Sequence, residues 1–306
     1  MGNRLFRPRL LRRLKGVRIK WVGLAVVIVM GLGASAAARN VGPAVLLELG
    51  TDARALGMGG AFVSLAGAAG TLAYNPAGLA YVSDQSISGY VTRPFGAFDH
   101  LAFGYARANL GASLLQMDVA TAARTNEFGN PTGQMLHYVS RAAVAGFGYE
   151  VFDGLAFGAQ LKGYFEENGP VRGFGWALDP ALLYASGAFK VGAVLKNAIS
   201  EAIVYDNGYR APWVTHWVLG GSWSLQLPAQ MALVLAADVE NLAQHEVRPH
   251  LGGELWIGNV GLRVGWDAGT LTAGASVLYR NLQVHWAYAF HESLPETLRL
   301  SASLSY

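Results

Sequence analysis

Apolar and polar residues alternate along most of the chain, from about Ser86 to the C-terminus. In the last ten residues the apolar side chains stand at every second position: Leu298, Leu300, Ala302, Leu304 and Tyr306. Arginine and serine residues fill the positions between them. A period of two is typical of a β-strand with one apolar and one polar side.

Turn signals divide this region into about fourteen segments, and we predict that each is a strand. The predicted strands are 86–95, 99–109, 111–119, 135–151, 154–165, 173–185, 187–197, 213–227, 231–241, 247–257, 260–268, 271–280, 282–291 and 297–306. Most are close to the roughly 9 to 11 residues of a tilted strand that spans a membrane.

The connections between these strands alternate in length. Long ones (120–134, 166–172, 198–212, 242–246 and 292–296) alternate with tight ones such as Asp153-Gly154 and Ser186-Gly187. Short turns at one end and long loops at the other are the layout of a bacterial outer-membrane barrel. We therefore predict an all-β fold, a transmembrane antiparallel β-barrel of about 14 strands (86–306). A soluble β-sandwich, which also alternates, is the competing fold.

Composition favours the barrel over the sandwich. Charged residues make up 14% of the chain and apolar residues 52%, whereas ordinary soluble domains contain about 25% charged residues. After residue 38 there is no run of 18 or more apolar residues, so we expect no membrane-spanning helix there. The eight Trp and thirteen Tyr suit the aromatic girdles of a membrane barrel.

Residues 1–38 have the pattern of a cleaved signal peptide. Eight Lys/Arg precede the apolar run WVGLAVVIVMGL, and small residues then fit cleavage after Ala36 or Ala38. An uncleaved anchor is the alternative. Without these eight residues, 15 basic residues face 20 acidic ones, a net charge of −5. We expect export to the cell outer membrane, outer-membrane lipid around the barrel and no nucleic-acid partner.

Residues 39–85 lie between the signal peptide and the first strand, and no residue from 55 to 83 is charged. A transmembrane helix is unfavourable in this segment because six glycines and Asn75-Pro76 would interrupt it. A phosphate-binding loop is also unfavourable, since no Gly-Lys-Ser/Thr follows the glycines.

Two sequence blocks in this segment resemble a known family. A-R-A-L-G-M-G-G-A-F-V (Ala53 to Val63) is followed by Y-N-P-A-G-L-A (Tyr74 to Ala80). Their order and spacing closely resemble the PorV/PorQ outer-membrane proteins, which are related to the FadL long-chain fatty-acid transporter family. The resemblance covers about 30 residues and implies a fourteen-stranded barrel with a small N-terminal hatch inside it.

By this resemblance we assign six residues to the hatch: Gly57, Gly59, Gly60, Asn75, Pro76 and Ala77. The family usually carries an acidic pair between the two blocks, where this chain has Ala66-Gly67-Ala68-Ala69. Any anchoring role of that pair is therefore absent or moved elsewhere. A chargeless, Gly-rich hatch could line a path for apolar molecules, or it could merely fill and stiffen the barrel.

Two further features bear on transport. Pro180, after Asp179, falls within a predicted strand, where proline deletes a ladder hydrogen bond. FadL-type transporters use a strand kink to open the wall toward lipid, so this pair marks a lateral portal or a plain β-bulge. The long connection 198–212 offers a possible extracellular apolar pocket of Ile199, Ile203, Val204, Tyr205 and Tyr209.

The sequence offers little for catalysis. Seven scattered histidines lack the spacing of a metal site, and cysteine is absent. His291-x-Ser293 is similar in spacing to the pair of barrel lipases, but His291 has the parity of the inward positions. We expect no catalytic residues, no metal, no cofactor and no enzymatic activity.

The function that these observations favour is a passive outer-membrane channel for hydrophobic small molecules such as long-chain fatty acids. The alternative, which the resemblance to PorV implies, is a non-transporting scaffold for protein secretion or surface attachment. The partner would then be a hydrophobic ligand or a secreted protein, respectively. The last strand ends in Tyr306, and we expect the barrel-assembly machinery to recognise it.

Overall fold

Antiparallel strands make up most of the computed structural model, which describes residues 44–306 except 66, 68–69, 127, 242–246 and 292–294. Within these residues fourteen strands form the closed barrel. They are β1 (Ser86–Thr92), β2 (Phe98–Arg107), β3 (Leu110–Thr125), β4 (Pro131–Phe152), β5 (Leu155–Asn168), β6 (Val171–Ser186), β7 (Phe189–Lys196), β10 (His216–Leu227), β11 (Met231–Asn241), β12 (Val247–Ile257), β13 (Val260–Asp267), β14 (Thr270–Tyr279), β15 (Leu282–Phe290) and β16 (Thr297–Ser305).

Each wall strand pairs with its neighbours in the chain, and the first and last strands close the ring. β1 pairs with β16 from Ser86↔Ser305 to Thr92↔Arg299, so that the barrel has no free edge. Closure matters because hydrocarbon offers no partner for exposed backbone N–H and C=O groups. The predicted all-β barrel and its fourteen strands are confirmed.

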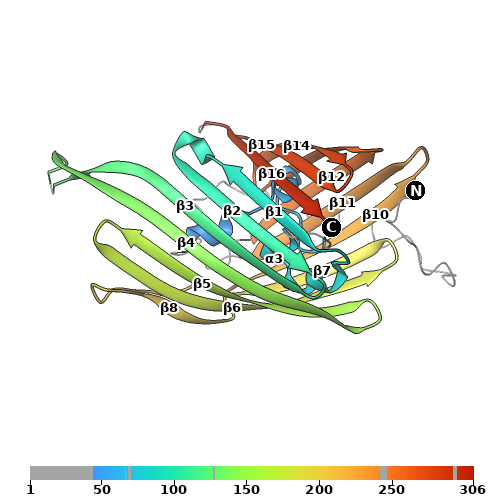
Figure 1. The fold of residues 1–306 in the computed structure, drawn as a ribbon, viewed down its shortest axis with the longest axis horizontal. Coiled ribbons are helices and arrows are strands. Elements are labelled where there is room, and N and C mark those ends of the chain that lie inside the picture. Colours follow the sequence, from blue (N-terminus) through green and yellow to red (C-terminus); the bar gives the residue numbers. More distant parts are fainter. Residues whose placement is uncertain (1–43, 66, 68–69, 127, 242–246, 292–294) are drawn as a thin grey trace. The chain divides into compact units, whose positions relative to one another are not determined.

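Three predicted loops contain more strand than we expected. In 166–172, predicted as a long connection, β5 and β6 continue to the pair Asn168↔Val171, so that only a tight turn remains. β3 and β4 continue to Thr125 and Pro131, so the predicted loop 120–134 is mostly hairpin. This long hairpin extends to the end opposite the chain's C-terminus (Figure 1). The predicted loop 198–212 holds β8 (Ile199–Tyr205) and β9 (Arg210–Ala211). Val204 pairs with Arg210, and Gly208, at φ +84°, turns the chain between them.

The outward face of the barrel is apolar. Large hydrophobic side chains are exposed along the strands, among them Leu101, Phe103, Leu161, Val191, Leu219, Leu262, Val264, Leu271 and Leu298. Exposed aromatic residues gather where strands meet the tight turns, including Tyr149, Phe152, Phe157, Tyr184, Phe189 and Tyr279. A contiguous apolar belt with an aromatic rim suits hydrocarbon with an interface beside it. No helix in the described part of the chain has the length and apolarity to span a membrane.

The chain before β1 folds against the inner side of the wall, and we call residues 44–85 the hatch. Its helical turns are η2 (Val45–Glu48), α2 (Ala53–Gly57), α3 (Thr71–Tyr74) and η3 (Pro76–Tyr81). α2 contacts β13 to β16, whereas η3 contacts β3 to β6. Figure 1 shows α3 among the wall strands. The hatch therefore reaches both sides of the lumen.

Glycines in the wall let the hatch backbone lie directly against the strands. A Cβ on Gly252 of β12 would lie 2.5 Å from the carbonyl oxygen of Met58. Cβ atoms on Gly148, Gly158, Gly192 and Gly265 would likewise overlap hatch backbone. Because a side chain at these positions would push the hatch away, part of the chain's high glycine content serves the hatch–wall contact.

Candidate functional site

The inner surface of the barrel is polar on β10 to β16, which we call the polar half, and largely apolar on β3 and β4, which we call the apolar half. β5 and β6 add the buried polar side chains Gln160, Lys162, Glu166 and Asp179. Strands β10 to β16 turn mostly polar buried side chains inward: His216, Ser222, Asp238, Glu240, His250, Glu254, Arg263, Thr272, Ser276, His285, Thr297 and Ser301. Strands β3 and β4 turn Leu115, Met117, Ala142 and Val144 inward. The two halves can therefore hold different molecules, or hold the hatch in different ways.

An ion-pair cluster fixes the hatch to the polar half. The Arg54 guanidinium donates to both carboxylate oxygens of Glu254, with Nε–Oε1 at 2.9 Å and Nη2–Oε2 at 2.6 Å. Arg263 of β13 donates to the same carboxylate from the wall. Burial alone would lower the pKa of Arg54, but the charge of Glu254 more than offsets it, so that the net shift is upward.

Hydrogen bonds to the hatch backbone strengthen this attachment. The Asp238 carboxylate of β11 accepts from the N–H groups of Phe62 and Val63 at 2.6 and 2.8 Å. The Ala53 N–H donates to Ser301 on β16 at 3.1 Å, and the Gly59 N–H donates to Thr272 on β14 at 3.1 Å. The wall thus satisfies backbone donors that the short helical turns leave unpaired.

Gly57, Gly59 and Gly60, predicted as hatch residues, lie against β12 to β15. Gly59 has φ +65°, and a Cβ there would lie 2.5 Å from the Trp266 backbone nitrogen. Gly60 has φ +81° and faces the His250 ring. Both the left-handed backbone and the close approach require glycine.

Asn75, Pro76 and Ala77, the other predicted hatch residues, lie on the opposite side of the lumen. Asn75 is fully buried. Its Oδ1 accepts from the Ala77 N–H at 2.9 Å, capping η3, and Nδ2 donates to the Val63 and Leu182 carbonyls. The structure therefore separates the six predicted residues into two groups, one at each side of the barrel.

The apolar half forms a continuous cluster, which we call the apolar column. Hatch residues Leu46, Leu72 and Leu79 pack in it with the inward residues of β3 and β4. At the other end it includes Tyr164, Ile203 and Ala211, with Trp213 packed against them. The column therefore connects the β8–β9 hairpin with η3 through the lumen.

At Asp179 and Pro180 the wall changes its pairing. Before this pair β6 is bonded to β8, with Leu178↔Ile199, and after it to β7, with Ala181↔Val194. Across the break β6 advances by three residues, from Leu178 to Ala181, whereas the paired segment advances by five, from Val194 to Ile199. On the other edge the pairing with β5 continues through Ala159↔Pro180.

The Asp179 carboxylate fills the break on the inner side. Its oxygens accept from the Asn197 N–H at 2.7 Å, from Gln160 Nε2 at 2.7 Å and from Lys162 Nζ at 2.7 Å. Lys162 also donates to Asn197 Oδ1 at 2.6 Å. Asn197 has φ +56°, which turns the chain from β7 into β8.

The five predicted pocket residues point to different sides of the β8–β9 hairpin. Ile203 is fully buried and Tyr205 packs beside it in the apolar column. Ile199, Val204 and Tyr209 are exposed, although the Tyr209 ring lies 5.7 Å from that of Tyr205. Ile203 and Val204 are successive residues of β8 and leave opposite faces. Ile199 has the parity of Ile203 but lies beyond the register shift between Glu201 and Val204.

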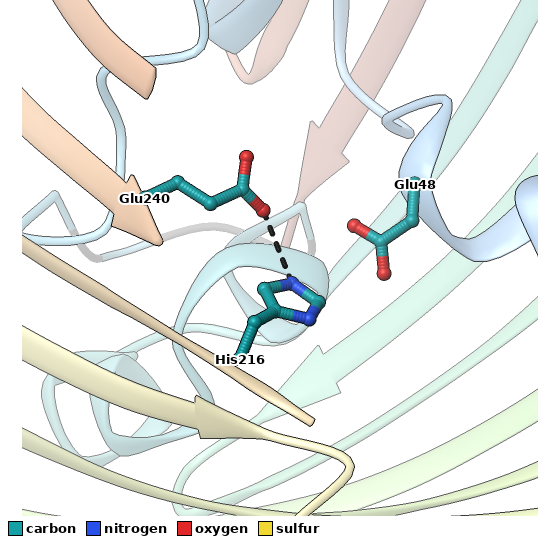
Figure 2. A group of neighbouring side chains, drawn as sticks. All are labelled: Glu48, His216 and Glu240. Atoms are coloured by element: carbon teal, nitrogen blue, oxygen red, sulfur yellow. Dashed lines mark ion pairs between the residues drawn. The ribbon is translucent and has the colours of Figure 1, made fainter. Parts of the chain in front are cut away.

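One polar group in the lumen was not foreseen from the sequence. Glu48 of η2, His216 of β10 and Glu240 of β11 converge in the lumen (Figure 2), and Lys196 Nζ lies 2.8 Å from Glu48 Oε2. Burial alone would raise the pKa of Glu48, but the charges of Lys196 and His216 lower it to about 2. These residues lie far apart in the chain, so no local motif indicated the group.

Several solved structures share this fold at low sequence identity. The toluene transporter TodX of Pseudomonas putida is 12% identical, with a TM-score of 0.55 over 84% of this chain and 98% of its own. The monoaromatic hydrocarbon channel CymD is 13% identical, with a TM-score of 0.58 over 84% and 98%. The toluene transporter TbuX of Ralstonia pickettii is 13% identical, with a TM-score of 0.55 over 84% and 97%.

No protein-family model and no curated protein sequence matches the chain. At identities this low the likeness establishes the fold that this chain has in common with the hydrocarbon channels: a fourteen-stranded barrel closed around an N-terminal segment.

Proposed function

We propose that the protein is a passive outer-membrane channel for hydrophobic small molecules. The apolar column carries this proposal, because its buried side chains would give an apolar molecule that displaced them an apolar lining from the β8–β9 hairpin to the hatch. Transfer from water to this lining lowers the free energy of an apolar solute, and no directional bond fixes the solute in one place. The shared fold with TodX, CymD and TbuX supports the same class of cargo.

Passage along this route requires the hatch to move away from the wall on its apolar side. The side chains of Leu46, Leu72 and Leu79 fill the column by packing, and the Leu79 carbonyl accepts one hydrogen bond, from the Asn109 N–H at 3.2 Å. Arg54 and the backbone of Phe62, in contrast, are fixed to the polar half by charged partners. Packing contacts are non-directional and can be replaced by those of an apolar cargo. We infer that the polar half anchors the hatch while the apolar half opens.

The break at Asp179 and Pro180 is our proposed lateral exit. The ladder with β7 and β8 is interrupted there, and the contacts of Lys162 and Asn197 with Asp179 close it from inside. Release to the periplasm past η3 is the other exit.

Extraction of the purified barrel tests the proposal. Mass spectrometry of the organic extract should show an apolar molecule that is enriched over bulk membrane lipid. The substitution Leu115→Asp, which places a carboxylate in the column, should remove it, whereas Ser222→Asp in the polar half should retain it. The same apolar content in both variants and in an unrelated barrel would contradict the proposal.

A PorV-like scaffold is the second candidate, and the long β3–β4 hairpin favours it. The ladder from Leu110↔Phe147 to Thr125↔Pro131 is much longer than the neighbouring β1–β2 ladder, and a channel does not need this extension. As a scaffold the chain would bind a secreted protein there. Deletion of residues 121–134 should then release a co-purifying protein and leave apolar cargo unaffected.

A further inference from the structure

Glu48, His216 and Glu240 bring three potential metal ligands together inside the barrel. One ligand atom from each residue lies within 4.8 Å of the other two. His216 and Glu240 are buried, and Glu48 is partly buried. The three residues come from η2 of the hatch, from the first residue of β10 and from the end of β11. Figure 2 shows their polar ends turned toward one another.

The orientation of the His216 ring points to a cation. Nδ1 lies 3.2 Å from the Val214 carbonyl oxygen, which can accept a proton from this nitrogen. Nε2 is buried and makes no hydrogen bond, yet it lies 3.1 Å from Glu240 Oε1. This contact is the ion pair drawn in Figure 2, and it directs Nε2 toward the two carboxylates.

This is also how proteins orient histidine ligands. A metal-binding histidine usually donates one ring N–H to a carbonyl or carboxylate, which directs the other nitrogen to the metal. The separation of Nε2 and Oε1 is close to the about 3.3 Å between adjacent ligands of tetrahedral zinc with bonds of about 2.0 Å.

We propose that Glu48, His216 and Glu240 bind one divalent transition-metal ion of the Zn²⁺ type. One imidazole nitrogen and two carboxylate oxygens suit a borderline metal, whereas Ca²⁺ and Mg²⁺ prefer oxygen ligands alone. The ion would join the hatch to two wall strands. This inference does not rest on the channel function.

Lys196, Lys162 and His250 surround the group, and His250 Nε2 lies 3.6 Å from Glu240 Oε2. Lys196 donates to Oε2 of Glu48, and the second carboxylate oxygen is the one that we assign to the ion. Lys162 forms its ion pair with Asp179 at 2.7 Å. A monodentate carboxylate that also accepts from a lysine is compatible with metal binding, since ligating carboxylates are commonly hydrogen-bonded.

The test uses the full chain, purified in detergent without a histidine tag and stripped with a chelator. Calorimetric titration with Zn²⁺ should show one equivalent bound. His216→Ala and Glu48→Gln should each weaken binding at least about tenfold, as disturbance of a metal site does. His285→Ala, which removes a buried lumen histidine beside Ser276, should leave binding unchanged. Heat-modifiable gel migration verifies that each barrel is folded.

Each remaining outcome overturns the proposal. If the folded wild-type chain binds no Zn²⁺, His216 and Glu240 form an ion pair and the group is no metal site. If all variants bind Zn²⁺ alike, the ion sits at a surface group such as His137 and Asp118, which lie 2.9 Å apart. Glu48→Gln changes a hatch residue outside the strands, so its result stands even where His216→Ala prevents folding.

Discussion

Arg54 of the hatch and Glu254 of β12 form a two-point ion pair inside the barrel, with contacts of 2.9 and 2.6 Å. The Glu254 side chain is fully buried, and Arg54 retains some exposure. Arg263 holds the same carboxylate from β13. The pair is therefore a specific link between the hatch and the wall.

Arg54→Ala should loosen the hatch without unfolding the barrel. Glu254 keeps Arg263 as its partner, so the buried carboxylate is not left alone. Loss of the charged pair should destabilise the hatch by about 1–3 kcal/mol, less than the roughly 3–5 kcal/mol for a buried charge that is left alone. Faster proteolysis of residues 44–85 and faster uptake of apolar cargo are the measurements. Arg93→Ala, which removes an exposed pair with Asp99, is the control, and equal proteolysis of both variants would refute the link.

Adjacent glycines on β12 provide a matched test of the hatch–wall contact. A Cβ at residue 252 would overlap the Met58 backbone, whereas one at residue 253 would meet side chains at 3.7 Å, an ordinary contact. Gly252→Ala should therefore cost about 1–3 kcal/mol by overpacking, and Gly253→Ala should be nearly neutral. Thermal unfolding monitored by hatch proteolysis measures both. Similar midpoints would show that the hatch does not press on this strand.

Pro180→Ala tests the lateral exit. Alanine restores a backbone donor at the point where β6 changes partners, and the added hydrogen bond should stabilise the wall by about 1 kcal/mol. We expect slower uptake of apolar cargo. Pro249→Ala, in a wall strand whose ladder with β11 is regular, is the control. Unchanged uptake in the Pro180 variant would show that the break is a β-bulge without a role in transport.

Alternation along the sequence predicted the barrel, because residues such as Leu298 and Leu300 must all face one side of a strand. It did not predict the continuation of β3 and β4 into 120–134, since strands there lack a clear two-residue period. The hatch glycines were found by resemblance. The resemblance did not predict that these glycines lie across the lumen from Asn75, because their separation depends on how the segment crosses the barrel.

Other parts of the site could not be found from the sequence. Glu48, His216 and Glu240 lie far apart in the chain and meet only when the hatch is in place. The division into a polar and an apolar half was also hidden, because inward positions on each strand carry the same period whatever their chemistry. Leu115 and Met117 share a face by alternation along β3, but only the ring order of the strands places Asp238 and Glu254 on the other side of the lumen.

Uptake by whole cells tests the channel most directly. A bacterial host that lacks its own channel for hydrophobic compounds would express the wild-type chain, Leu115→Asp or Ser222→Asp at equal levels, with radiolabelled toluene and a long-chain fatty acid as probes. We predict uptake of at least one probe above the empty host and its loss by at least about tenfold in Leu115→Asp, as an added barrier of about 1.4 kcal/mol would give. Ser222→Asp should transport like the wild type. Uptake by the wild-type chain no faster than by the empty host, for both probes, would contradict the account.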